Sequence, residues 1–263
     1  MTPAFAAALG ALGLGGAFIS GLLGVGGAIV MIPLLLYVPP LLEVGVLDMK
    51  DVAGVTMVQV FVAALSGVLA HRRHRAVHGQ LVWLGGGTMA AGAFAGALLS
   101  HFVPATWLLV TFALMATAAA ALWLAPVATE GQPIFADAVH FDRVKTVAVT
   151  LGVGFAAGLV GAGGAFLLVP LLLVVVGIPI RVTLGSSLGI TAIAATAGVV
   201  GKLATGQVPL VPACAVALGA LPGAHFGAAV SRRLPGAQLK ILLAVVTIAS
   251  AARVWWDLLA GKP

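Results

Sequence analysis

The sequence predicts an all-α integral membrane protein built from two repeats of five apolar segments each. Three observations point to this class. Only 8% of the 263 residues are charged, whereas soluble domains carry about a quarter, so the chain cannot cover a soluble globule of its size. Hydrophobic residues make up 62% of the chain, with a mean hydropathy of +1.19. A glycine–proline motif also occurs twice. A soluble enzyme, a nucleic-acid-binding module and a disordered protein are thereby excluded.

The two repeats are recognised by their glycines. Four glycines and a proline recur 137 positions later, and further matches follow at a constant offset of 131. The first set pairs Gly21, Gly24, Gly26, Gly27 and Pro33 with Gly158, Gly161, Gly163, Gly164 and Pro170, and the second includes Gly54, Gly92 and Ser100 with Gly185, Gly223 and Ser231. We therefore expect a first repeat at 1–128, a polar linker at 129–143 and a second repeat at 144–263.

Each repeat contains five apolar segments. We expect helices at 4–23, 28–42, 52–70, 80–99 and 105–125, and again at 146–160, 165–176, 183–201, 209–230 and 237–256. The segments are apolar on all sides, which is typical of helices in lipid or in a bundle core. A crossing takes about 20 residues, so we expect about eight to ten membrane helices. The first segment lacks a basic region and a cleavage site, so we expect it to be retained.

The second segment of each repeat is short. Between Gly27 and Pro39 lie 11 residues, and between Gly164 and Gly177 lie 12. As helices they would be about 17 and 18 Å long, whereas the hydrocarbon core is about 30 Å thick. Each follows a Gly-x-Gly-Gly turn. We therefore expect each repeat to begin with a broken or re-entrant helical hairpin whose glycine tip lies inside the protein.

Counting crossings predicts inverted repeats. A hairpin returns to its starting side, and three further crossings place the second repeat on the opposite side. This arrangement puts nine Lys and Arg residues on one face and four on the other, as the positive-inside rule favours. Both termini are then outside, and the basic loop at 71–78 is cytoplasmic. The formal net charge of +6 is a topology signal of this kind and does not indicate nucleic acid.

The polar residues argue against catalysis. All seven carboxylates fall in loops or at segment ends, which excludes a carboxylate proton relay within the membrane. No acid–base pair lies in one apolar region, and the glycine runs lack the Lys-Ser/Thr of a phosphate loop. We therefore expect no enzyme activity, no catalytic residue, no cofactor and no metal site.

The two glycine tips are the candidate anion site. Each precedes a helix start, at Ala28 and Ala165, and a helix start offers unpaired N–H groups and partial positive charge. An oxyanion could be held there without a buried Lys or Arg. The candidate substrate-binding residues are Gly24, Gly26, Gly27, Thr56, Gln59, Gly161, Gly163, Gly164, Ser186, Ser187 and Thr191, and the candidate for proton coupling is His225.

Each candidate also has a structural interpretation. The glycines could only pack helices, as small residues do in membranes. Hydroxyls such as Thr56 and Ser187 could bond back to helix carbonyls. Gln59 could bond between helices, and His225 could be a packing or capping residue near the interface.

The glycine–proline motif, its copy from Gly158 to Pro170, the run Gly185-Ser186-Ser187 and the basic loop resemble the TauE/SafE family of membrane transport proteins. The resemblance covers nearly the whole chain and implies a multi-pass permease of the bacterial inner membrane. Its substrate would be sulfite or an organosulfonate such as sulfoacetate, moved by alternating access, and we expect export. One departure is Gly54-Val55-Thr56, where a Gly-Thr-Ser-like run is expected.

The implied partners are a small sulfur-containing anion and the lipid bilayer, without nucleic acid. The oligomeric state is left open between a monomer and a homodimer. The alternative function is a channel-like or metal-ion-handling membrane protein, in which the histidines of the loop at 71–78 would dominate.

Overall fold

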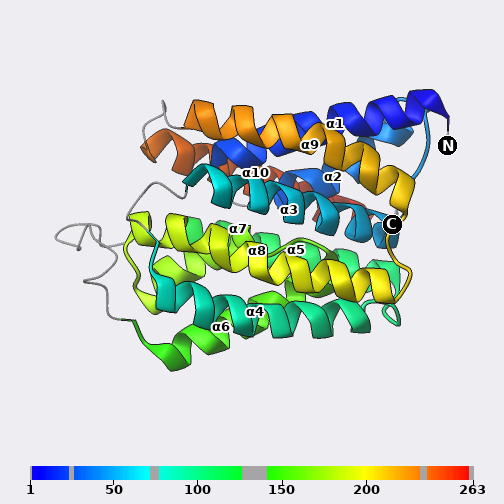
Figure 1. The fold of residues 1–263 in the computed structure, drawn as a ribbon. Coiled ribbons are helices and arrows are strands. Elements are labelled where there is room, and N and C mark those ends of the chain that lie inside the picture. The colour runs from blue at the N-terminus through cyan, green and yellow to red at the C-terminus, as the bar shows by residue number, and fades with distance from the viewer. Residues whose placement is uncertain (1, 24–26, 72–76, 126–140, 232–235, 261–263) are drawn as a thin grey trace.

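The computed structural model describes residues 2–23, 27–71, 77–125, 141–231 and 236–260, and within these ranges every regular element is a helix (Figure 1). The helices are α1 (Pro3–Leu23), α2 (Ala28–Leu41), α3 (Met49–His71), α4 (Gly79–Leu99), α5 (Ala105–Leu124), α6 (Arg143–Val160), α7 (Ala165–Leu171), the π-helix η2 (Leu172–Val176), α8 (Ile180–Ala204), α9 (Leu210–Ser231) and α10 (Gly236–Leu259).

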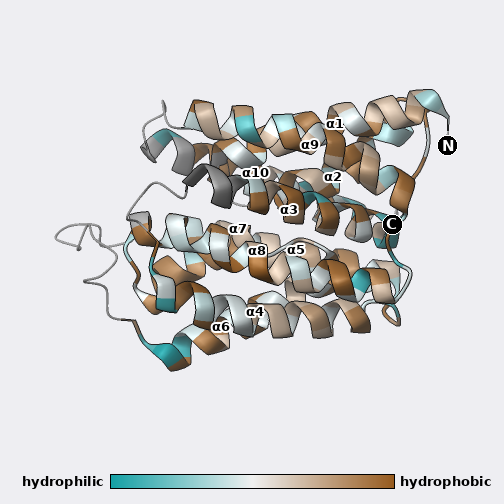
Figure 2. Cartoon of the chain, in the orientation of Figure 1, coloured by the Kyte–Doolittle hydropathy of each residue, from teal (hydrophilic) through white to brown (hydrophobic). Residues whose placement is uncertain are grey.

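Eight of the described helices are long and apolar enough to cross a membrane, and the expected all-helical membrane class is confirmed. These are α1, α3, α4, α5, α6, α8, α9 and α10. The apolar helices at Ala28–Leu41 and Ala165–Val176 are shorter, as their sequences predict. Figure 2 shows apolar residues along all the helices, with a hydrophilic group at the start of α6.

One of the two short segments matches the prediction and the other differs in detail. Helix α2 spans Ala28–Leu41, which ends within one residue of the expected 28–42, and it passes through Pro39 and Pro40. Proline keeps a helical φ and removes only one N–H donor, and here the carbonyls of Pro39 and Pro40 accept from Val44 N at 3.2 Å and Glu43 N at 3.1 Å. The second short segment is not one α-helix, because α7 turns into the π-helix η2 directly after Leu171.

The helix pairs follow the repeat. If α1–α5 are matched in order with α6–α10, each major packing pair has a counterpart in the other half. The contact of α1 with α9 corresponds to that of α6 with α4, and the contact of α3 with α9 corresponds to that of α8 with α4. The contact of α2 with α10 likewise corresponds to that of α7 with α5. The pairs α3–α8 and α5–α10 map onto themselves. Figure 1 shows the resulting two groups, with α1, α2, α9 and α10 above and α4, α6, α7 and α8 below.

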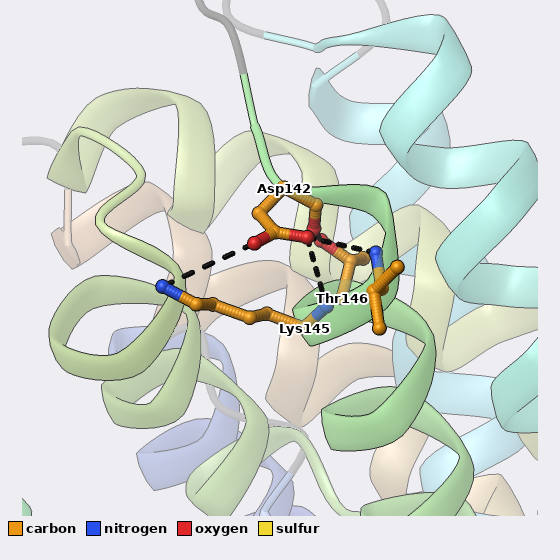
Figure 3. A network of polar contacts seen from close by, with 4 residues as sticks. Asp142, Lys145 and Thr146 are labelled. Atoms are coloured by element: carbon orange, nitrogen blue, oxygen red, sulfur yellow. Dashed lines mark hydrogen bonds and ion pairs between the residues drawn. The ribbon is translucent and has the colours of Figure 1, made fainter.

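The first helices of the two halves start at opposite ends of the bundle. Helix α1 begins at the end where both chain termini are marked, and α6 begins at the other end (Figure 1). Asp142 caps α6, because its Oδ1 accepts from Val144 N at 2.9 Å and Lys145 N at 3.1 Å (Figure 3). Lys145 Nζ also lies 4.0 Å from Asp142 Oδ2. This is a capped helix start of the kind Asp favours.

Glycines let the paired helices approach backbone to backbone. A Cβ on Gly158 of α6 would lie 2.8 Å from Ala93 Cα of α4, and a Cβ on Gly21 of α1 would lie 3.0 Å from Ala224 Cα of α9. Gly158 and Gly21 are repeat partners. These two glycines of the repeated motif therefore take the packing role, which membrane helices commonly give to small residues.

Candidate functional site

The two glycine tips have the same backbone conformation. Gly27 is the N-cap of α2 with φ 72°, and Gly164 is the N-cap of α7 with φ 71°. A side chain is rare in this left-handed region, and neither N-cap carries a side-chain cap bond. The first N–H groups of each helix therefore lack an intrahelical acceptor. The predicted site residues Gly24 and Gly26 lie outside the described residues.

The second tip is held against α3. A Cβ on Gly161, which has φ 77°, would collide with Ala53 O, and one on Gly163, with φ 61°, would collide with the side chain of Val60. Thr56 Oγ1 lies 2.9 Å from Gly161 O. The structure therefore brings Gly161, Gly163 and Thr56 together, although they are more than a hundred positions apart in the chain.

The first tip is lined by polar groups. A Cβ on Gly27 would lie 2.6 Å from Ser20 Oγ of α1 and 3.3 Å from Gln59 Nε2 of α3. The equivalent point on Gly164 is surrounded by Met89 Cε, Val153 Cγ1 and Ala157 Cβ, all within 2.9 Å. The two tips thus have the same backbone conformation but different surroundings, which are polar at the first tip and apolar at the second.

Two of the predicted residues are fully buried without a hydrogen-bond partner among the described residues. They are Gln59, through both amide atoms, and Thr191, through its hydroxyl. An unpaired buried polar group costs about 1–3 kcal/mol of stability. The bond between helices that was the structural alternative for Gln59 is not formed within the described part of the chain. As far as the described residues go, both side chains therefore have hydrogen-bonding groups left for a ligand.

Three other predicted hydroxyls have partners in the protein. Ser187 Oγ lies 3.1 Å from Leu184 O, and Thr56 Oγ1 lies 2.7 Å from Val52 O, which are bonds back to the own helix. Ser186 Oγ accepts from His78 N at 3.1 Å, at the start of α4. All three residues are fully buried. Ser186 is thus bonded to the start of α4, while Thr56 is the hydroxyl residue that also bonds to a glycine tip, at Gly161 O.

The histidines do not form a cluster in the part of the chain that is described. His225 lies on α9 with its side chain exposed. His78 caps α4, because its Nδ1 accepts from Leu81 N at 3.2 Å. Within the described ranges no three His, Cys, Asp or Glu side chains lie close enough to hold a metal ion. His74 and His140 lie outside those ranges, and of His71 only the backbone is described.

Lys202 follows the expected segment at 183–201 directly, but the structure places it inside α8 and buries it. This residue of α8 is fully buried, and its Nζ donates to Ser100 Oγ at 2.7 Å, Leu159 O at 3.1 Å and Gln207 Oε1 at 3.2 Å. Leu159 lies in the last turn of α6 and Ser100 is the C-cap of α4. The negative ends of two helix dipoles therefore stabilise the ammonium without a carboxylate.

The sequence analysis did not single out Lys202, although the internal repeat assigns it a counterpart. It is the repeat partner of His71, at the offset of 131 that relates the third segments. A lysine at a segment end is usually assigned to the water interface. Its burial depends on the convergence of α4 and α6 upon the end of α8, which is a property of the folded bundle.

Comparison with known proteins identifies the family. The family model described as "Sulfite exporter TauE/SafE" matches residues 9–254. A "Probable membrane transporter protein" of Xylella fastidiosa (strain Temecula1 / ATCC 700964) is 35% identical over 182 residues, which cover 68% of this chain and 67% of the relative. The "Probable membrane transporter protein YunE" of Bacillus subtilis (strain 168) is 26% identical over 256 residues, 90% of this chain and 92% of its own. No solved structure matches the chain. The chain therefore belongs to the TauE/SafE family and is a multi-pass transporter of the bacterial inner membrane.

Proposed function

We propose that this transporter exports a sulfur-containing anion, sulfite or an organosulfonate such as sulfoacetate, from a site between its two glycine tips. The observation that supports this most strongly is the fully buried amide of Gln59, which has no hydrogen-bond partner among the described residues and lies beside the start of α2. An oxyanion inside the membrane must be solvated by donors, and an amide with helix N–H groups supplies them. The family description, which names sulfite export, supports the substrate class.

The proposed site contains the tips and the third segments of both repeats. The tip residues are Gly24, Gly26, Gly27, Gly161, Gly163 and Gly164, and the residues alongside are Thr56, Gln59, Ser186, Ser187 and Thr191. Within the described part of the chain, Gln59 and Thr191 have hydrogen-bonding groups without a partner. Thr56 and Ser187 would first have to release the carbonyls of Val52 and Leu184. We therefore assign the leading role to Gln59 and Thr191.

Alternating access is proposed to arise from inversion of the two repeats. The opposite starting ends of α1 and α6 and the exchange of helix pairs between the halves support this arrangement. In such folds one group of helices rocks against the other around a fixed site. His225 remains the proposed proton-coupling residue, and a flattened pH dependence of transport by His225→Gln is its test.

The proposal is tested by anion flux into and out of proteoliposomes, with sulfite and sulfoacetate as substrates. Gly163→Ala is expected to reduce flux sharply, because alanine strains a left-handed turn and collides with Val60. Since that collision also threatens folding, the double variant Gly163→Ala with Val60→Ala removes it and keeps the alteration of the tip.

The matched control is Gly87→Ala on α4, where an added Cβ meets nothing within 4 Å. Flux should be unchanged in the control and lost in the double variant, with similar melting temperatures for both. Full flux in a folded double variant would show that the second tip only packs helices, and the site would have to lie elsewhere.

A further inference from the structure

The two glycine tips have equivalent backbones in the repeat, but the side chains around them differ. Ser20, Gly27 and Gln59 of the first half correspond to Ala157, Gly164 and Ile190 of the second. Ser20 Oγ and Gln59 Nε2 both lie within 3.3 Å of the point that a Cβ on Gly27 would occupy. The equivalent point on Gly164 is contacted only by carbon atoms at its three nearest approaches. The difference therefore lies in side-chain chemistry and not in backbone geometry.

The amide of Gln59 can form two kinds of hydrogen bond. Its nitrogen is a donor and its oxygen is an acceptor, and both are buried and unpartnered among the described residues. A fully deprotonated oxyanion offers only acceptors, so it would satisfy the amide nitrogen and leave the amide oxygen without a donor.

On the basis of the proposed function, we infer that the preferred substrate is an organosulfonate that carries its own hydroxyl or N–H donor close to the sulfonate group. The sulfonate accepts from Gln59 and from the N–H groups at the start of α2, while the substrate's donor binds the Gln59 carbonyl oxygen. The carbon portion of the substrate faces the apolar second tip. Gln59 is then the residue that sets specificity, through a contact that its counterpart Ile190 cannot make.

The decisive experiment compares two sulfonates that differ in one hydroxyl. Wild-type protein in proteoliposomes is assayed with ethanesulfonate and with 2-hydroxyethanesulfonate at the same pH and membrane potential. The apparent KM should be lower for the hydroxyl compound by about tenfold, which corresponds to one hydrogen bond to a group that is otherwise left unpaired. This comparison needs no variant and so does not depend on the folding of one.

A variant then assigns the preference to the amide. Gln59→Leu should bring the KM ratio close to one, while its melting temperature should equal or exceed that of the wild type because a buried unpaired amide is removed. A purely structural glutamine would show the reverse pattern, with a lower melting temperature and an unchanged ratio. The control is Thr196→Val, which removes an exposed hydroxyl on α8 and should leave the ratio as in the wild type.

The outcomes separate this inference from the proposed function. Equal KM values for the two sulfonates in the wild type would overturn the inference and leave sulfonate transport standing. Absence of flux for sulfite and for every sulfonate, in protein that is folded, would overturn the proposed function itself. A preference for the hydroxyl compound that persists in folded Gln59→Leu would place the recognising group elsewhere and also overturn the assignment to Gln59.

Discussion

At the scale of single residues, Lys202 shows how a charge can be buried without a counter-charge. Its ammonium has three neutral acceptors, and two of them belong to the C-terminal ends of α4 and α6. Such helix ends carry partial negative charge. The residue therefore ties together the ends of three helices.

We predict that Lys202→Met destabilises the protein by about 1–3 kcal/mol, because Leu159 O loses its side-chain donor in a buried setting, while Gln207 Oε1 keeps its bond from Ser100 Oγ. The measurement is the unfolding midpoint in detergent micelles. Lys50→Met is the matched control, since Lys50 Nζ makes one exposed bond to His101 O and its loss should cost less than about 1 kcal/mol. Equal midpoints for the two variants would contradict the role assigned to Lys202.

At the scale of helices, hydropathy predicted the existence of every segment, and it predicted the end of α2 to within one residue. Helix α2 passes through Pro39 because a last turn loses little when an N–H is missing. The π-helix after α7 has no signal in the sequence that we recognise. Both details depend on local backbone geometry that periodicity does not describe.

We predict that Gly158→Ala lowers stability by about 1–3 kcal/mol, because α6 must move away from Ala93 of α4. Gly152→Ala on the same helix is the matched control, since an added Cβ there meets nothing within 4 Å, and alanine favours a helix over glycine. Thermal unfolding of the two variants in the same detergent measures the difference. A neutral Gly158→Ala would mean that the α4–α6 contact is looser than the structure describes.

At the scale of the whole molecule, the sequence was informative about architecture and less so about the site. The membrane class follows from composition and length, and the repeat from constant offsets between glycines. The candidate hydroxyls could not be sorted in advance. In the sequence a helix hydroxyl looks the same whether it bonds to Leu184 O, as Ser187 does, or has no partner among the described residues, as Thr191 has none. That distinction arises only when the helices pack.

The most direct test of the inverted architecture is the side of the membrane on which each end of the bundle lies. Single cysteines at Thr2, Val77 and Ala260, all exposed positions, are introduced into a Cys214→Ala background, which removes the one native cysteine. Intact cells are treated with a membrane-impermeant maleimide. Positions 2 and 260 should react and position 77 should react only after permeabilisation. Labelling of position 77 together with either terminus in intact cells, or of only one terminus, would contradict the inverted repeats and the alternating-access mechanism built on them.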